Sequence, residues 1–302
     1  MPKKPCGTIS LLFFLEPVMS SIVFLNGDFC KEEDAKVSIF DRGYLFGDGI
    51  YEVVPVINGK VIDKEPFYER FNASLSKISL KAPYCKAEIE TILDTLIAKN
   101  DVVEGGIYMQ VTRGVAPREF YFPENTPTTF MAFTFKKEII KNPLAEKGVK
   151  VVSCADIRWK RRDIKSISLL GQVLAKEEVH QKGAYEGWMV EDGFVTEGTS
   201  SAAFIVKDGV IITRPLSNAI LPSIRRKLLM EYTQKNNIKV EERLFTIEEA
   251  LNADEAFMAS ATIFVLPIIE IDGKPIGSGK PGPMVKKLRE MYVEAALKEA
   301  NA

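Results

Sequence analysis

The sequence predicts a two-domain α/β protein of the α+β kind. Its 302 residues exceed one typical domain and predict two domains of roughly 120 to 160 residues each. Hydrophobic residues make up 46% of the chain and charged residues 27%, the composition of an ordinary globular protein. Runs of alternating apolar residues and runs with apolar residues at spacings of three and four occur in separate groups. This arrangement is typical of mixed sheets with segregated helices.

The first domain is expected at residues 20–137. Two segments, 66–78 and 86–100, have apolar residues at helical spacing, so each predicts a helix. Runs rich in β-branched and aromatic residues predict strands at 21–27, 106–114 and 128–135. Residues 1–19 are expected to be a disordered extension, because their short apolar run ends at Glu16 and Pro17 without a signal-cleavage site.

The second domain is expected at residues 145–302, after a charged linker at 138–144 that carries Pro143. Apolar residues at helical spacing predict helices at 168–183, at 223–236 and from about 282 onward. Strand-like runs occur at 149–157, 186–192, 201–209, 210–214, 238–245 and 255–273.

The charge and the cysteines favour small-molecule chemistry. A formal net charge of −1 gives no electrostatic reason to expect nucleic acid or an anionic membrane as partner. No run reaches the roughly 18 apolar residues of a membrane span. The only histidine, His180, is expected on a helix surface, so no histidine-rich metal site is expected. Scattered cysteines predict neither disulfides nor a zinc site and fit the cytoplasm: Cys6, Cys30, Cys85 and Cys154.

A glycine-rich stretch, KVSIFDRGYLFGDGIYEVVPV, leads into a strand-like run that begins near Tyr51. Gly47, Gly49 and Glu52 give G-x-G-x-x-E, which lacks the third glycine of a dinucleotide-binding loop. The segment GKPIGSGK has the wrong spacing for a phosphate loop, and no G-x-S-x-G elbow occurs. We therefore reject the nucleotide and serine-hydrolase interpretations.

Lys165 is a candidate nucleophile in the segment DIRWKRRDIKSISLLGQ. It lies between a polar turn and an expected helix whose apolar residues should face a core, namely Leu169, Leu170, Val173 and Leu174. Its amine is expected near the helix N-terminus and near Arg161 and Arg162, and both features disfavour the protonated amine. An unprotonated amine is what Schiff-base chemistry needs. On this stretch alone, a solvated surface lysine is the commoner alternative.

Glu197 is a second candidate, in the segment FVTEGTSSAAFIV. It lies between a strand end and a turn of small residues. A carboxylate beside such hydrogen-bonding groups suits a planar heterocycle that approaches the backbone. Taken alone, the segment is an ordinary loop.

Together these segments resemble the class IV, branched-chain-type fold of pyridoxal-phosphate (PLP) enzymes, also called PLP fold type IV. The likeness is strongest to D-amino acid aminotransferases, and it runs from about Ile22 to the C-terminal helix. It is carried, in the family's order, by DRGYLFGDGIYEVV, YMQVTRGVAPRE, DIRWKRRDIKSISLLGQVLAKEE and VTEGTSS. The resemblance implies pyridoxal 5'-phosphate as cofactor and the conversion of D-alanine and 2-oxoglutarate to pyruvate and D-glutamate.

The resemblance also implies a cofactor site. Lys165 would carry PLP as a Schiff base and shuttle a proton between substrate Cα and cofactor C4′. Glu197 would keep the pyridine nitrogen protonated. Arg70 and the backbone amides of Ile224 and Arg225, at a helix start, would bind the phosphate. The remaining cofactor contacts would come from Ser200, Leu221 and the backbone of Ala261. Arg225 stands where threonine is commoner, which would add positive charge near the phosphate.

The substrate site implied by the resemblance needs a homodimer. Tyr51 would hold the α-carboxylate together with Arg118, which in this family reaches in from the neighbouring subunit. Tyr108 would form another wall, and Ser260 would contact the substrate. Phe120 stands where the family usually has a histidine, so a polar contact worth roughly 1–3 kcal/mol is missing unless another group replaces it.

Other activities share this fold. Branched-chain L-aminotransferases, R-selective amine transaminases and aminodeoxychorismate lyases would also use Lys165 and Glu197, whereas the segment from Val111 to Phe120 favours the D-specific group. A non-catalytic PLP carrier is the alternative from a different class. The joint presence of Lys165, Glu197 and Arg70 disfavours it.

Overall fold

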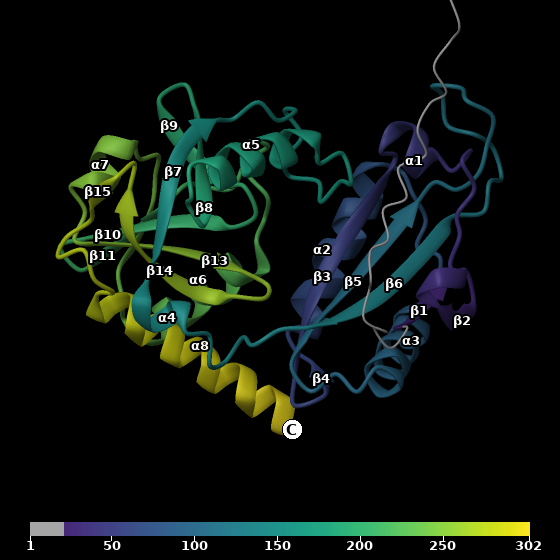
Figure 1. Cartoon of the computed structure of the whole chain (residues 1–302), viewed down its shortest axis with the longest axis horizontal. Helices are drawn as coiled ribbons and strands as arrows, with labels where there is room; N and C mark the ends of the chain where they lie inside the picture. Colours follow the sequence, from purple (N-terminus) through teal and green to yellow (C-terminus); the bar gives the residue numbers. More distant parts are fainter. Residues whose placement is uncertain (1–20) are drawn as a thin grey trace, which may run out of the picture.

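The computed structural model describes residues 21–302, so the expected extension at 1–19 lies outside the described residues. Two β-sheets, each with its own helices, form two halves that lie side by side (Figure 1). Among residues 21–302, no helix is long and apolar enough to cross a membrane.

The first half contains a six-stranded sheet in the order β2-β1-β6-β5-β3-β4, and every neighbouring pair is antiparallel. Its strands are β1 (Ile22–Leu25), β2 (Asp28–Lys31), β3 (Gly49–Ile57), β4 (Lys60–Val61), β5 (Gly105–Thr112) and β6 (Thr129–Lys136). Its helical segments are the 3-10 turn η1 (Glu32–Asp34) and helices α1 (Arg42–Phe46), α2 (Lys64–Lys77) and α3 (Lys86–Lys99).

Helices α2 and α3 cover one face of this sheet (Figure 1). In α2 the residues Phe67, Phe71 and Leu75, spaced four apart, are buried. Their spacing places them on one side of the helix, where they join Val54 and Ile107 of the sheet in a shared core. The helical spacing read from the sequence therefore predicted both helices to within two residues of their ends.

The second half contains a nine-stranded mixed sheet in the order β12-β11-β10-β13-β14-β7-β8-β9, with β15 paired to β14. The pairs β11–β12, β14–β7 and β7–β8 are parallel. The strands are β7 (Val149–Ala155), β8 (Glu186–Glu191), β9 (Phe194–Gly198), β10 (Ala202–Lys207), β11 (Val210–Thr213), β12 (Val240–Glu242), β13 (Glu255–Ser260), β14 (Phe264–Ile271) and β15 (Lys274–Pro275). The helices are α4 (Leu144–Lys147), α5 (Leu170–Gln181), α6 (Ile224–Lys235), α7 (Ile247–Leu251) and α8 (Pro283–Asn301).

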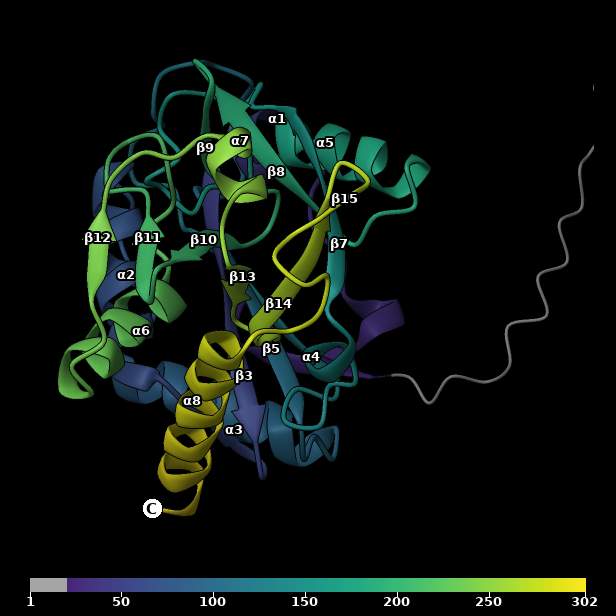
Figure 2. The same ribbon diagram turned by 90° about the vertical axis from the view of Figure 1, so that its left-hand side faces the viewer.

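The C-terminal helix α8 connects the two halves. It runs from the nine-stranded half toward β4 (Figures 1 and 2). Near its end, the carboxylate of Glu299 accepts a hydrogen bond from the backbone N–H of Asp63 at 2.9 Å. Tyr292, in the same helix, donates its hydroxyl proton to the Asp63 carboxylate at 2.9 Å. These bonds fix the two sheets relative to each other, and the candidate site lies between them.

Candidate active site

A cavity of about 630 Å³ lies between the two halves. Tyr51 and Arg70 reach it from the six-stranded half, and most of its wall comes from the nine-stranded half. The sequence-predicted site residues that line it are Tyr51, Arg70, Lys165, Glu197, Ser200, Leu221, Ser260 and Ala261.

Lys165 is positioned by the start of β3. The backbone N–H of Tyr51 donates to the carbonyl of Lys165 at 2.9 Å, and the N–H of Ile167 donates to the carbonyl of Gly49 at 3.2 Å. The Lys165 ammonium lies 4.1 Å from the centroid of the Tyr51 ring. A Cβ at Gly49 would lie 2.4 Å from the carbonyl oxygen of Val111, so only glycine permits this close packing. The glycine-rich turn therefore brings Tyr51 and Lys165 together.

The helix expected after Lys165 begins two residues later than the predicted start at 168. Helix α5 begins at Leu170, because the segment around Lys165 pairs with β3 and cannot be helical there. The guanidinium of Arg161 pairs with Asp163 at 3.0 Å, and that of Arg162 pairs with Glu191 at 2.8 Å. Both arginines are therefore paired with carboxylates.

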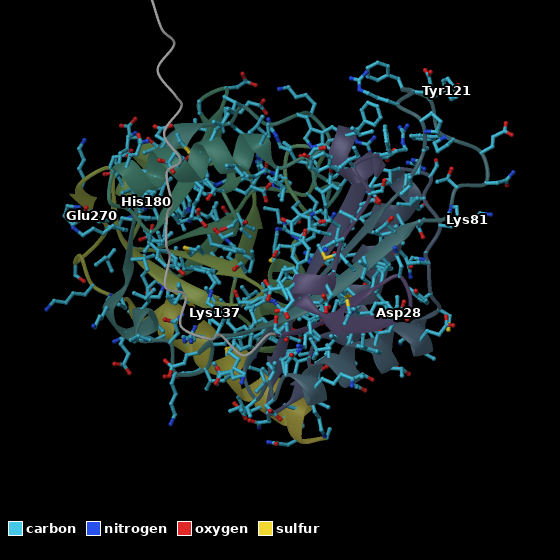
Figure 3. The ribbon with its side chains drawn as sticks, turned by 45° about the vertical axis from the view of Figure 1, so that its right-hand side comes forward. Asp28, Lys81, Tyr121, Lys137, His180 and Glu270 are labelled. Carbon is cyan, nitrogen blue, oxygen red and sulfur yellow. The ribbon has the colours of Figure 1, made fainter. Side chains whose placement is uncertain are left out.

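The apolar face of α5 was also placed incorrectly. Leu170, Val173 and Leu174 were expected to face a core, but their side chains are 71%, 59% and 51% exposed. Ala175 and Val179 are the buried residues of this helix. His180 lies exposed on the same helix (Figure 3).

Glu197 lies near the end of β9 and is buried. Its Oε1 is 2.6 Å from Nη1 of Arg158, and both carboxylate oxygens accept from the backbone N–H of Leu221 at 3.2 Å. Burial raises the pKa of Glu197, while Arg158 and the Leu221 amide act in the opposite direction. The carboxylate is therefore held in one orientation in the cavity wall.

The partner of Glu197, Arg158, was missed from the sequence. Its Nη2 lies 2.7 Å from Oδ2 of Asp156, and the Thr196 hydroxyl donates to the same carboxylate at 2.6 Å. Asp156 and Arg158 follow directly after β7 and are two residues apart. That spacing places side chains on the same side of an extended segment, and it is the signal that could have identified the pair.

Arg70, in α2, is fixed by the buried Glu52. Its Nε and Nη2 donate to the two Glu52 oxygens at 2.8 and 2.6 Å. Its Nη1 donates to the carbonyl of Pro222 at 3.4 Å, which places the guanidinium at the start of α6. The first backbone N–H groups of a helix, here those of Ile224 and Arg225, have no acceptor within the helix. A guanidinium beside such amides is suited to bind a phosphate.

The expectation for the Arg225 side chain is wrong. Its guanidinium is buried, pairs with Asp63 and contacts the hydroxyl of Tyr292. It is not among the cavity-lining residues, so it adds no positive charge to the cavity wall. A buried Asp63 needs a cationic partner, and Arg225 supplies it. Ile224 is likewise buried, in the core of the six-stranded half.

A tight connection between β13 and β14 brings Ser260 and Ala261 to the cavity. Phe264, which follows it, has a φ of 55°, an uncommon conformation for a bulky residue. On the other side, Ser200 donates its hydroxyl proton to Glu186 at 2.8 Å. Glu186 is fully buried and was also missed from the sequence.

Tyr108, Arg118 and Phe120 do not line the cavity of their own chain. Tyr108 lies on the neighbouring strand β5 and stacks on the Tyr51 ring, with the ring centroids 5.6 Å apart. The guanidinium of Arg118 lies 5.6 Å from the ring centroid of Phe120, whose side chain is 79% exposed. Figure 3 shows the nearby Tyr121 at the outer edge of the molecule. This loop is thus free to contact another molecule.

The comparisons with known proteins identify relatives along most of the chain. The model of the family described as amino-transferase class IV matches residues 49–271. The D-alanine aminotransferase of Staphylococcus aureus (strain N315) is 42% identical over 278 residues, which cover 90% of this chain and 98% of that protein. That of Listeria monocytogenes serotype 4b (strain F2365) is 40% identical over 274 residues, with coverages of 90% and 95%.

Solved structures confirm the predicted fold type. The branched-chain amino acid aminotransferase of Thermoproteus uzoniensis with norvaline superposes with a TM-score of 0.83, at 26% sequence identity, over 93% of this chain and 96% of that one. That of Escherichia coli superposes with a TM-score of 0.85, at 22% identity and with the same coverages. The sequence and structure comparisons both confirm the resemblance read from the blocks around Lys165 and Glu197. The chain belongs to the class IV aminotransferase family.

Proposed function

We propose that the protein transfers amino groups between D-amino acids and 2-oxo acids, converting D-alanine and 2-oxoglutarate to pyruvate and D-glutamate. The observation that carries this proposal is that Lys165, Glu197 and Arg70 face one cavity between the two halves. The curated relatives at 40–42% identity are D-alanine aminotransferases, which supports the choice of D-amino acids.

Class IV aminotransferases use PLP, and the residues of the cavity fit this cofactor. Arg70 and the first amides of α6 suit its phosphate, and the buried Glu197 suits its pyridine nitrogen. Lys165 would hold its aldehyde carbon through the side-chain amine, and Leu221 and Ser200 line the same cavity. When bound, PLP supplies an acceptor for the electron pair that remains on the substrate Cα after its proton leaves.

The side chains of this chain then have separate tasks. The Nζ of Lys165 would take the proton from the substrate Cα and deliver it to the cofactor carbon C4′, and would move it in the opposite direction in the second half of the reaction. Glu197 holds a proton at the ring nitrogen, and the Arg158 ion pair keeps the carboxylate in place for that hydrogen bond. Tyr51, whose ring lies beside Lys165, orients the α-carboxylate.

A homodimer is part of the proposal, with Arg118 of one subunit completing the α-carboxylate site of the other. Exposed apolar side chains line the cavity at Trp159 and Val173, and further ones lie in the same segments, at Ile157, Leu170 and Leu174. A group of large exposed apolar residues is typical of a protein interface, and a second copy of this chain is the partner that the exposed Arg118 loop favours.

Two further parts of the proposal concern organisation and location. We take the two halves as domains at 20–137 and 145–302 that are joined by 138–144. A cytoplasmic location fits the three free cysteines among the described residues, Cys30, Cys85 and Cys154.

The test is a panel of half-reactions. The purified protein is mixed with D-alanine, L-alanine and a primary amine in turn, and the cofactor absorbance and the pyruvate formed are measured. Loss of the yellow band with D-alanine alone is expected. Pyruvate from L-alanine only would refute the stereochemical part. Borohydride reduction followed by peptide mapping should label Lys165, and a label on another lysine would refute the assigned site.

A further inference from the structure

Two further lysine side chains line the same cavity, and none of the roles proposed above uses them. Lys137 directly follows β6, and Lys176 lies in α5, and both line the cavity. Figure 3 shows Lys137 where the chain leaves the six-stranded half. In the register of β3, β5 and β6, Lys136 is level with Val56, whereas Tyr51 lies toward the opposite end of β3. Lys137 thus approaches the cavity from the end opposite Tyr51.

The charges at this end do not balance. The Lys176 ammonium bonds to the carboxylate of Glu186 at 3.1 Å and to the carbonyl of Tyr185 at 2.7 Å. Lys137 has no acidic partner among residues 21–302, and its ammonium donates to the Thr262 hydroxyl at 3.1 Å. Glu186 is therefore paired with Lys176, and the charge of Lys137 has no carboxylate partner among the described residues at the cavity wall.

The surroundings of Lys137 favour an anionic ligand. Lys137 is an exposed residue at the cavity rim. Its ammonium is nevertheless partly desolvated, and this desolvation, together with the charge of Lys176, lowers its pKa. Because Thr262 accepts a hydrogen bond from Lys137, its own hydroxyl proton is free to donate. An ammonium and a hydroxyl donor side by side match the two oxygens of a carboxylate.

We propose that Lys137 and Thr262 bind the distal carboxylate of a dicarboxylic substrate, as in 2-oxoglutarate or glutamate. Tyr51 holds the α-carboxylate at one end of the cavity, and Lys137 holds the second carboxylate at the other. Pyruvate and alanine, which lack that group, make no use of this subsite. The inference rests on the proposed function, because the subsite would recognise one of the two substrate pairs of that reaction, 2-oxoglutarate and glutamate.

The test compares acceptors that differ only in the distal group. The amine form of the holoenzyme is mixed with 2-oxoglutarate or with 2-oxopentanoate, in which a methyl group replaces the distal carboxylate, and the return of the cofactor absorbance is followed. Lys137→Met should raise the half-saturating concentration of 2-oxoglutarate roughly tenfold, because one charged hydrogen bond to the substrate is lost. The value for 2-oxopentanoate should change less than about twofold. Lys137→Arg should stay close to the parent protein.

The matched control is Lys136→Met, which removes the neighbouring lysine outside the cavity lining and should alter neither acceptor. The proposal is overturned if Lys137→Met affects both acceptors equally or leaves 2-oxoglutarate unchanged. Calorimetric titration with glutarate and with pentanoate gives a readout without turnover, because neither can accept an amino group. Tighter glutarate binding that Lys137→Met abolishes supports the subsite even if D-alanine yields no pyruvate, in which case only the proposed function fails.

Discussion

The guanidinium of Arg158 and the carboxylate of Glu197 form an ion pair inside the cavity wall, with Nη1 2.6 Å from Oε1. Arg158 is held from its other side by Asp156, at 2.7 Å. Oε2 of Glu197 accepts only from the Leu221 N–H among the described residues, so it keeps capacity for one more donor. The protonated nitrogen of a pyridine ring is such a donor.

Replacing Arg158 with methionine should destabilise the protein strongly. Both Glu197 and Asp156 would stay buried without their cationic partner, and breaking a buried pair in this way costs about 3–5 kcal/mol. Urea unfolding at pH 7 measures the loss. Arg161→Met is the matched control, because Arg161 is 43% exposed and, among residues 21–302, pairs only with Asp163, so it should cost less than about 1 kcal/mol. Equal losses in the two variants would contradict the assigned role of Arg158.

Glu191 should make the stability depend on pH at the acid end. Hydrogen bonds from Arg162 and Lys160 lower the pKa of Glu191 from 4.5 to about 2. The folded state therefore binds the Glu191 proton less tightly than the unfolded state. This stabilisation is fully present above pH 4.5 and is lost as the pH falls toward 2. Because the side chain is partly exposed, we expect it to contribute on the order of 1–2 kcal/mol.

Glu191→Gln should thus lower the free energy of unfolding at pH 7 and have a much smaller effect near pH 2. Urea unfolding of both proteins at a series of pH values measures the difference. Glu178→Gln is the control, because Glu178 pairs with Lys182 on the exposed surface of α5 and should have little effect at any pH. A Glu191→Gln difference that stays constant from pH 7 to pH 2 would exclude the ion pair as its cause.

Local patterns predicted the parts of the fold that local chemistry determines. The four-residue spacing of Phe67 and Phe71 was sufficient to place α2, because a helix buries such a stripe whatever it packs against. The same reasoning failed in α5. The spacing of Leu170 and Leu174 shows that one face is apolar, but it does not show what covers that face.

Residues of the candidate site could be named from the sequence where short segments carry them, and they were missed where distant segments meet. Lys165 and Glu197 lie in blocks that can be read from the sequence alone. The pairing of Lys165 with Tyr51 is a contact between segments far apart in the chain, so no local signal could show that it excludes a helix start. Several charged residues follow one another after β7, and the ion pair with Glu197 that distinguishes Arg158 depends on tertiary structure.

Arg225 should be required for stability and not for the charge of the cofactor site. Arg225→Thr introduces the residue expected at this position, but it leaves the buried Asp63 without a cation. We expect a loss of about 3–5 kcal/mol in the free energy of unfolding. Changing Asp63 to asparagine in the same chain should recover part of it, because the buried charge is then removed. A stable Arg225→Thr protein with weaker cofactor binding, measured by absorbance titration, would contradict the buried pair.

Gly49 should link stability to activity. In Gly49→Ala the new methyl group would lie 2.4 Å from the carbonyl oxygen of Val111 and 3.0 Å from Cδ1 of Ile167, so β3 or the segment after Lys165 must move. Overpacking of this kind costs typically about 1–3 kcal/mol. Since the same contacts align Tyr51 with Lys165, kcat/KM for D-alanine should also fall by at least about tenfold, because small misplacements of reacting groups are costly. Urea unfolding and steady-state kinetics measure the two effects.

Gly193→Asn is the control: its φ is +81°, which asparagine tolerates, and no atom lies within 4 Å of a Cβ there. If Gly49→Ala lowers stability but leaves kcat/KM at the level of the control, the turn supports the fold without positioning the amine.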